Sequence, residues 1–138
     1  SVATAESCTG GYIAHLITSI AGSSDYYNGS IIAYANKVKI NELQVKEEVI
    51  AEYGVVSEEV VKQMAIGVQK KLNSDYGIAT SGVAGPDGGS DIKPVGTVWI
   101  AVASPEKVVA KKFLFGKNRN RNIKKSATAA LNMLRKMI

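Results

Sequence analysis

The sequence predicts a three-layer α/β/α sandwich, an α/β fold in which a mixed, mostly parallel sheet of about five strands lies between two layers of helices. Short runs that are typical of β-strands alternate along the chain with longer segments whose apolar residues recur at helical spacing. The last two strand-like runs are separated only by a short turn and precede a closing helix. This ending predicts a hairpin added to an otherwise parallel sheet.

The chain opens on a strand followed by a helix. Residues 1–5 form a short strand-like run, part of which consists of small residues. Residues 9 to about 20 predict a helix, because apolar side chains recur there on one helical face. These side chains belong to Tyr12, Ile13, Leu16, Ile17 and Ile20. The segment Ala21-Gly22-Ser23-Ser24 ends this helix.

A second strand is predicted over residues 26–35, which are rich in β-branched and aromatic residues. A turn or bulge is expected to interrupt it near Asn28-Gly29. Residues 36–43 fit either a short helical turn or a loop, and residues 45–53 fit a short helix that ends at Gly54.

A longer helix is predicted after Ser57, whose hydroxyl is a good N-cap. Glu58 and Glu59 then fall in the first turn, where the helix dipole favours acidic residues. The helix carries one apolar stripe formed by Val60, Val61, Met64, Ala65, Val68 and Leu72. We therefore expect this stripe to be buried against the sheet.

Three strands and one helix complete the chain. Residues 76–80 predict a buried strand, and residues 97–103 and 108–115 predict two strands paired through the turn at Ser104-Pro105-Glu106. A final helix runs from about residue 120 to 137. Its apolar side is formed by Ile123, Ala127, Leu131, Leu134 and Ile138.

Length and composition fit one globular domain over residues 1–138, since 46% of the residues are hydrophobic and 21% are charged. No run approaches the roughly 20 apolar residues that cross a bilayer, and no segment has the order of a signal peptide. Cys8 is the one cysteine, which agrees with a reducing compartment, so we expect a cytoplasmic protein. Because the chain begins at Ser1 directly in a strand, we also expect a short helix upstream.

Positive charge is concentrated in the last third of the chain, whose formal net charge as a whole is +5. The segment from Lys107 to Lys136 contains ten basic residues and no acidic one. Such a field attracts nucleic acid, an anionic membrane surface or a phosphorylated metabolite. No nucleic-acid-binding motif or row of interleaved aromatic residues accompanies the charge, so nucleic acid is the least favoured of these partners.

Two glycine-rich loops follow predicted strands, namely Glu6-Ser7-Cys8-Thr9-Gly10-Gly11 and Thr80-Ser81-Gly82-Val83-Ala84-Gly85-Pro86-Asp87-Gly88-Gly89. Glycine lets backbone N–H groups approach a ligand, and an open α/β sheet presents its functional loops at the carboxyl ends of its strands. The loops therefore predict a site for an anionic small molecule, although neither matches a Walker or dinucleotide fingerprint. In the alternative interpretation, Ser7 or Thr9 is an ordinary N-cap and the glycines allow close helix packing.

A serine nucleophile at Ser7 needs a base. His15, the only histidine, falls in an apolar helical stretch and is poorly placed, and without a second histidine or a cysteine cluster no zinc site is expected. A lysine remains as the candidate base if burial or a neighbouring positive charge lowers its pKa. Lys37 and Lys39 follow the 26–35 strand, where each would supply the other's perturbing charge. Taken alone, such a pair is typical of a solvated surface.

Four groups of residues stand out by their order and spacing. They are Ala5-Glu6-Ser7-Cys8-Thr9-Gly10-Gly11, Tyr34-Ala35-Asn36-Lys37-Val38-Lys39, Val55-Val56-Ser57, and Ser81-Gly82-Val83-Ala84-Gly85-Pro86-Asp87-Gly88-Gly89 with Lys93-Pro94-Val95-Gly96-Thr97-Val98-Trp99. Together these groups closely resemble the CinA C-terminal domain family, the nicotinamide-nucleotide amidases. The resemblance spans nearly the whole chain, and members of the family usually have a short helix before the first strand.

The resemblance implies that the protein hydrolyses the carboxamide of nicotinamide mononucleotide to nicotinate mononucleotide and ammonia, in pyridine nucleotide recycling. Ser7 matches the family nucleophile, Lys39 the family lysine, and Tyr34 the tyrosine five residues before it. In the implied mechanism Lys39 takes the Ser7 proton, the alkoxide attacks the amide carbon, and the N–H groups of Thr9 and Gly10 hold the oxyanion. Water then resolves an acyl-enzyme, and no metal or cofactor is needed.

The phosphate and ribose of such a substrate need further contacts. The candidates are Ser81, Gly82 and Gly85 in the second loop, and Arg119, Arg121 and Lys124 near the start of the last helix. Relatives commonly carry two arginines at that helix start, whereas this chain reads Gly116-Lys117-Asn118-Arg119-Asn120-Arg121-Asn122-Ile123-Lys124. The register is therefore open by about one residue, and Arg119 is the first choice.

A second hypothesis makes the domain a non-catalytic nucleotide-binding or regulatory module of a competence- or damage-inducible type of protein. The intact set of Ser7, Tyr34 and Lys39 favours catalysis over this alternative. Because relatives with this fold often associate, we also expect a homo-oligomer.

Overall fold

Five strands form a single sheet in the computed structural model, which describes residues 1–138. The strands are β1 (Val2–Glu6), β2 (Tyr27–Ile32), β3 (Tyr76–Gly82), β4 (Thr97–Ala103) and β5 (Val108–Leu114), in the spatial order β2-β1-β3-β4-β5. β1 is parallel to its neighbours β2 and β3, whereas β4 is antiparallel to β3 and β5. Four of the five strands therefore point the same way, and the predicted α/β fold with a mixed five-stranded sheet is confirmed.

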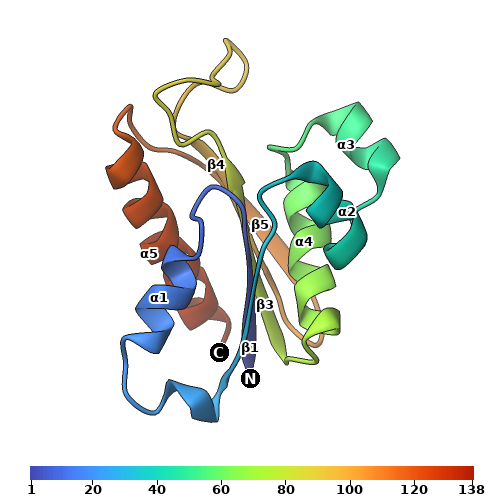
Figure 1. Ribbon diagram of the computed structural model, residues 1–138, viewed down its shortest axis with the longest axis vertical. Helices are drawn as coiled ribbons and strands as arrows, with labels where there is room; N and C mark the ends of the chain where they lie inside the picture. Colours follow the sequence, from blue (N-terminus) through green and yellow to red (C-terminus); the bar gives the residue numbers. More distant parts are fainter.

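Helices cover both faces of this sheet (Figure 1). The α-helices are α1 (Tyr12–Thr18), α2 (Asn36–Leu43), α3 (Glu47–Tyr53), α4 (Glu58–Lys71) and α5 (Arg119–Met137), and one 3₁₀ turn, η1, spans Ser23–Asp25. α1 and α5 lie on one face, whereas α2, α3 and α4 lie on the other, which makes three layers. None of these helices is both long and apolar enough to span a lipid bilayer.

Each face of the sheet buries its own apolar cluster because successive strand residues point to opposite faces. On β3 and β4, Ala79 and Ala101 belong to the cluster under α4, whereas Ile78 and Ile100 belong to the cluster under α1 and α5. The small residues let α4 approach closely, and a Cβ added at Gly77 would lie 2.2 Å from the carbonyl oxygen of Ala65. Burial on both faces explains why the central strands consist mostly of apolar and small residues.

The start of α4 agrees with its sequence signals. The hydroxyl of Ser57 accepts a hydrogen bond from the N–H of Val60 at 3.3 Å, as expected of an N-cap. The apolar stripe of the helix from Val60 to Val68 is buried. Propensity, cap and amphipathic pattern point to the same structure here, so this element was predictable from local sequence alone.

Near the first loop, α1 starts later than the sequence-based expectation, the bulge in β2 agrees with it, and α2 resolves the alternative that was left open. α1 begins at Tyr12 rather than near residue 9, because Gly10 and Gly11 have φ angles of 58° and 100°, outside the helical region. The bulge expected in β2 is present at Asn28, since Val2 pairs with Tyr27 whereas Ala3 pairs with Gly29. The segment for which a turn or a loop was left open forms the complete helix α2.

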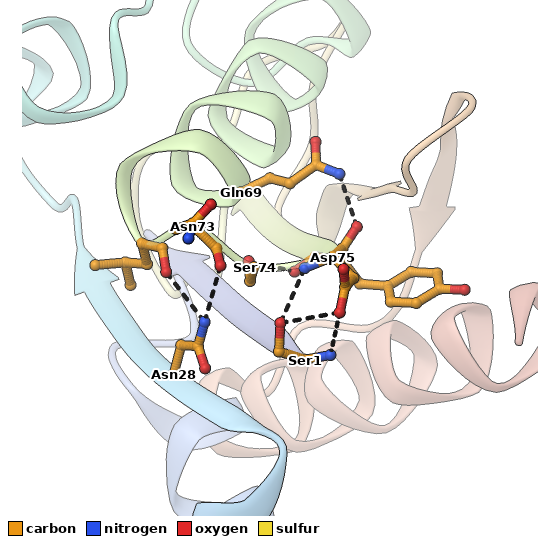
Figure 2. A network of polar contacts seen from close by, with 8 residues as sticks. Ser1, Asn28, Gln69, Asn73, Ser74 and Asp75 are labelled. Carbon is orange, nitrogen blue, oxygen red and sulfur yellow. Dashed lines mark hydrogen bonds and ion pairs between the residues drawn. The ribbon is translucent and has the colours of Figure 1, made fainter.

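A polar network joins the amino-terminal ends of β1 and β3 (Figure 2). The carboxylate of Asp75 accepts hydrogen bonds from the amino group and the hydroxyl of Ser1, at 2.6 Å and 3.1 Å. Gln69 donates to the backbone oxygen of Asp75, and Asn28 donates to the carbonyls at the end of α4. This network lies near both chain termini, at the opposite end of the sheet from the two glycine-rich loops.

Candidate active site

Ser7 is the first residue after β1 and is held by backbone contacts to both neighbouring strands. Its N–H donates to the carbonyl oxygen of Thr80 on β3 at 3.2 Å, and the carbonyl of the preceding Glu6 accepts from the N–H of Ala33, just beyond β2, at 2.9 Å. The side chain is almost fully buried, with 9% of the residue exposed. The sheet thus places one serine hydroxyl at the carboxyl ends of three strands.

Lys39 lies on α2 and reaches back to Ser7. Its Nζ is 3.1 Å from the Oγ of Ser7, 2.7 Å from the carbonyl oxygen of Ala33 and 3.2 Å from that of Tyr34. The residue is 1% exposed, which is rare for a lysine. The two residues that the sequence paired as nucleophile and base are therefore in hydrogen-bonding contact.

Burial lowers the pKa of Lys39, because removal of water disfavours the charged ammonium. The sequence left two causes open, burial or a positive charge from Lys37. The structure points to burial, since Lys39 is buried whereas Lys37 is exposed. A lysine whose ammonium is disfavoured in this way is suited to act as a proton acceptor.

Glu6, which precedes Ser7 in the chain, is fully buried and was not expected from the sequence to have a role in the site. Five hydrogen bonds end on its carboxylate, donated by the backbone N–H groups of Gly11, Ile13 and Ala14 and by the hydroxyls of Thr4 and Thr9. The carboxylate therefore caps α1, whose own N-cap residue, Gly11, offers no side chain. An acidic residue just before a glycine-rich turn and a helix is the only signal in the sequence for such a cap.

The backbone N–H groups after Ser7 divide into free and occupied donors. That of Gly10 donates to the carbonyl of Ser7 at 3.0 Å, so it is already engaged, which differs from the oxyanion role expected of Gly10. The N–H groups of Cys8 and Thr9 donate no hydrogen bond within the chain. The uncommitted donors next to the nucleophile are thus those of Cys8 and Thr9.

A cavity of about 200 Å³ opens over the Ser7–Lys39 pair. Its lining comes from the segments after β1 and β2, from α2, from the α3–α4 loop, from the end of β3 and the loop after it, and from the start of α5. The residues are Ser7, Cys8, Tyr34, Asn36, Lys39, Val55, Val56, Ser81, Gly82, Ala84 and Arg119. Asn36 is a lining residue that the sequence analysis named only as part of a motif. The volume is below the roughly 300–1,000 Å³ typical of small-molecule pockets.

Arg119 is the basic residue of the last helix that reaches this cavity. Its Nη1 donates to the carbonyl of Gly85 at 2.7 Å, and its Nη2 lies 3.4 Å from the hydroxyl of Tyr34. Arg121 and Lys124 are exposed on α5 and do not line the cavity. The choice of Arg119 among the three basic candidates therefore agrees with the geometry.

The other predicted site residues have more limited contacts. Ser81 and Gly82 line the cavity, although the Ser81 hydroxyl is committed to the carbonyl of Val55 at 2.9 Å. Gly85 does not line it and acts through its carbonyl on Arg119. Tyr34 contacts Lys39 through its main-chain oxygen, and the residue is 63% exposed at the rim of the cavity.

The surroundings of Cys8 and His15 argue against a role for either side chain as nucleophile or base. Burial raises the pKa of Cys8 to about 12, so its thiol stays protonated despite its place beside Ser7. His15 is exposed on α1, as expected, and lies outside the cavity. Ser7 is left as the candidate nucleophile, a hydroxyl with an amine 3.1 Å away.

A larger cavity of about 460 Å³ lies at the other end of the sheet, between α1 and α5. It is lined almost wholly by apolar side chains, including Leu16, Ile17 and Leu134. No nucleophile–base pair faces it, so chemistry is assigned to the smaller cavity over Ser7.

The fold and this site define an α/β-sandwich domain with a buried serine–lysine pair at the carboxyl ends of its parallel strands. A family model described as the CinA C-terminal domain matches residues 1–138. The chain belongs to this family, and the predicted family resemblance is confirmed.

Known relatives agree with this assignment. A CinA-like protein of Cytophaga hutchinsonii is 54% identical over 138 residues, and one of Microcystis aeruginosa is 50% identical over 139 residues. The matches cover 100% and 99% of this chain but 33% of each relative, so the chain spans about a third of the length of the curated relatives it matches.

Solved structures share the fold over nearly the whole chain. The competence/damage inducible protein CihA from Agrobacterium tumefaciens superposes with a TM-score of 0.94 at 38% identity, covering 96% of this chain and 82% of that one. A competence-damaged protein (CinA) superfamily protein from Escherichia coli superposes with a TM-score of 0.95 at 29% identity, covering 99% and 80%. The three-layer fold is therefore that of the CinA superfamily.

Proposed function

We propose that this domain is an amidohydrolase that converts nicotinamide mononucleotide to nicotinate mononucleotide and ammonia, in pyridine nucleotide recycling, with Ser7 as nucleophile and Lys39 as base. The observation that carries the proposal is the 3.1 Å contact between the Nζ of Lys39 and the Oγ of Ser7, made by a buried lysine. The substrate is suggested by the motifs shared with nicotinamide-nucleotide amidases.

Lys39 donates in all three of its contacts as an ammonium, and the same three contacts can be met by an uncharged amine if the Ser7 hydroxyl becomes the donor. A neutral amine has two N–H donors and one lone pair, and the carbonyl oxygens of Ala33 and Tyr34 can take the two donors. The lone pair is then left for the O–H of Ser7. The neutral amine of Lys39 would then have all its hydrogen-bonding groups occupied. It could act as a base without first losing a proton.

Catalysis would begin when Lys39 takes the Ser7 proton and the Oγ attacks the carboxamide carbon. The oxyanion that forms would be held by the free N–H groups of Cys8 and Thr9. Lys39 would then return the proton to the amide nitrogen, so that ammonia leaves and an acyl-serine remains. Attack of water on this ester, with Lys39 again accepting a proton, would release nicotinate mononucleotide and restore Ser7.

The remainder of the substrate would lie along the rim of the site. The cavity of about 200 Å³ has room for the nicotinamide ring, while the ribose and phosphate extend outwards. Arg119 lies at that rim, where its guanidinium can form paired hydrogen bonds with a phosphate. The positive charge of the surrounding α5 adds long-range attraction for the phosphorylated end.

The decisive experiment is ammonia release from nicotinamide mononucleotide by the wild type, Ser7→Ala and Lys39→Ala in the full-length protein. The proposal predicts release by the wild type and loss of release in both variants. Release that survives in Ser7→Ala would point to direct attack by water. A wild type that binds the nucleotide with no ammonia release would favour the non-catalytic binding module instead.

A further inference from the structure

We infer that Glu6 is a positioning residue, which holds the turn of residues 7–11 so that the Oγ of Ser7, which lines the cavity, stays aligned with the Nζ of Lys39. Its five hydrogen bonds join the turn to β1 on one side and to the start of α1 on the other. The inference rests on the proposed serine chemistry, but it concerns the alignment of Ser7 and not the identity of the substrate.

The first argument is that the Glu6 carboxylate accepts hydrogen bonds from the backbone N–H groups at the start of α1. Oε1 accepts from the N–H groups of Gly11 and Ile13 at 3.1 Å and 2.9 Å, and Oε2 accepts from Ala14 at 2.9 Å. These are the first donors of the helix, which would otherwise attract an anion. Because they are filled from within, an incoming oxyanion is left with the donors of Cys8 and Thr9.

The second argument is the link from Glu6 to the neighbouring strand. The hydroxyl of Thr9 donates to Oε1 at 2.7 Å and lies 2.9 Å from the hydroxyl of Thr80. Thr80 also accepts the N–H of Ser7 through its carbonyl oxygen. The middle of the turn is therefore tied to the same β3 residue that holds the nucleophile.

The third argument is that Glu6 and Lys39 are both hydrogen-bonded to Ala33. The N–H of Ala33 donates to the backbone oxygen of Glu6 at 2.9 Å, while the carbonyl of Ala33 accepts from the Nζ of Lys39 at 2.7 Å. One peptide segment thus sets the position of the base relative to the residue that orders the nucleophile's turn. A shift of Glu6 would change the Ser7–Lys39 alignment, although Glu6 does not itself line the cavity.

Glu6→Gln is the sharpest test because it keeps the side-chain length and removes one acceptor. With its amide oxygen at the Oε1 position, glutamine keeps the acceptor for Thr9, Gly11 and Ile13. Its NH₂ group then faces the N–H of Ala14, and two donors cannot bond. Val68→Ala is the matched control, since it weakens the core under α4 far from the turn.

The readout is the rate at which Ser7 is labelled by an alkyl fluorophosphonate, in which the Oγ forms a bond to phosphorus and fluoride leaves. Mass spectrometry follows the label, so this rate needs no amide substrate. We expect Glu6→Gln to react about 10- to 100-fold more slowly while folded, as misalignment of a catalytic group predicts. Val68→Ala should keep the wild-type rate at a similar loss of thermal stability. On nicotinamide mononucleotide, Glu6→Gln should lower kcat and leave KM within about twofold.

A Glu6→Gln protein that labels at the wild-type rate overturns the inference, and so does equal slowing in Val68→Ala. If Glu6→Gln does not fold, Thr9→Val tests the same link, because it keeps the helix cap and removes the Thr9 hydroxyl. Slower labelling supports the inference and an unchanged rate overturns it. A wild type that labels at Ser7 but releases no ammonia contradicts the proposed substrate alone, whereas a wild-type Ser7 that resists the probe overturns both.

Discussion

The Nζ of Lys39 lies 3.1 Å from the Oγ of Ser7, although 32 residues separate them in sequence. The contact depends on parallel pairing of β1 and β2, which places the end of β1 beside the start of α2. Because the lysine is buried with backbone carbonyls around it, the pair has the arrangement of a nucleophile and its base.

Replacement of Lys39 by methionine should abolish most catalysis while the fold is kept. Methionine has a similar length but no proton acceptor, so ammonia release from nicotinamide mononucleotide should fall by about 10²- to 10⁴-fold, the usual contribution of a general base. Lys39→Arg should be equally inactive, since a guanidinium does not lose its proton. Steady-state ammonia assays with circular dichroism as the folding control measure this, and a variant that keeps a tenth of the activity would rule Lys39 out.

The stability of the fold should depend on the protonation of Lys39. Its pKa in the folded state is lowered below the ordinary value of 10.5, so between the two values the unfolded chain binds more protons. The free energy of unfolding therefore gains a positive slope with pH across that window, ending near pH 10.5. Urea unfolding of the wild type and Lys39→Met at several pH values measures the difference in slope. Parallel curves for the two proteins would show that the amine is not desolvated.

Arg119 should govern recognition of the phosphate. Arg119→Ala removes the guanidinium at the cavity rim, so the KM for nicotinamide mononucleotide should rise about 10- to 100-fold, the value of a hydrogen bond to a charged group, with little change in kcat. Nicotinamide riboside, which lacks the phosphate, should show no such change. Arg121→Ala is the matched control from the same helical turn, outside the cavity. Equal effects of the two variants would indicate a general charge effect.

The thiol of Cys8 should react slowly with alkylating agents, although it is next to Ser7. With a pKa of about 12, its thiolate fraction at pH 8 is about a thousandfold below that of an ordinary thiol, and alkylation should slow in proportion. The time course of iodoacetamide labelling, with glutathione as reference and guanidinium-unfolded protein as the accessible control, measures the effect. Labelling of the folded protein at the glutathione rate would contradict the buried, protonated thiol.

Much of the fold was predictable because its signals are local. The Ser57 cap, the acidic first turn and the apolar stripe of α4 all lie within one segment of 16 residues, from Ser57 to Leu72. The hairpin of β4 and β5 was equally visible, since both strands and their turn are contiguous. Ser7 and Lys39 were chosen for their residue types and family motifs, and only the parallel pairing of distant strands brings them together.

The burial of Lys39 and the role of Glu6 could not be predicted, because the sequence does not show which way these side chains point. The sequence of residues 36–43 fitted either a helical turn or a loop, so it did not show which of Lys37 and Lys39 is buried. In the helix that forms, positions two apart differ by about 200°, which leaves Lys37 exposed and buries Lys39. The role of Glu6 was hidden for a similar reason, because its partners belong to a helix start set by the φ angles of Gly10 and Gly11.

The most direct test of the account is the charge of Lys39 in the folded protein. An NMR titration that follows the side-chain ¹³Cε and ¹⁵Nζ signals of Lys39, assigned by their loss in Lys39→Arg, measures its pKa. The account predicts a midpoint clearly below 10.5, with the neutral amine accessible while the protein stays folded. A midpoint at or above 10.5 would mean that the ammonium is stabilised beside Ser7, and Lys39 would then not be the base.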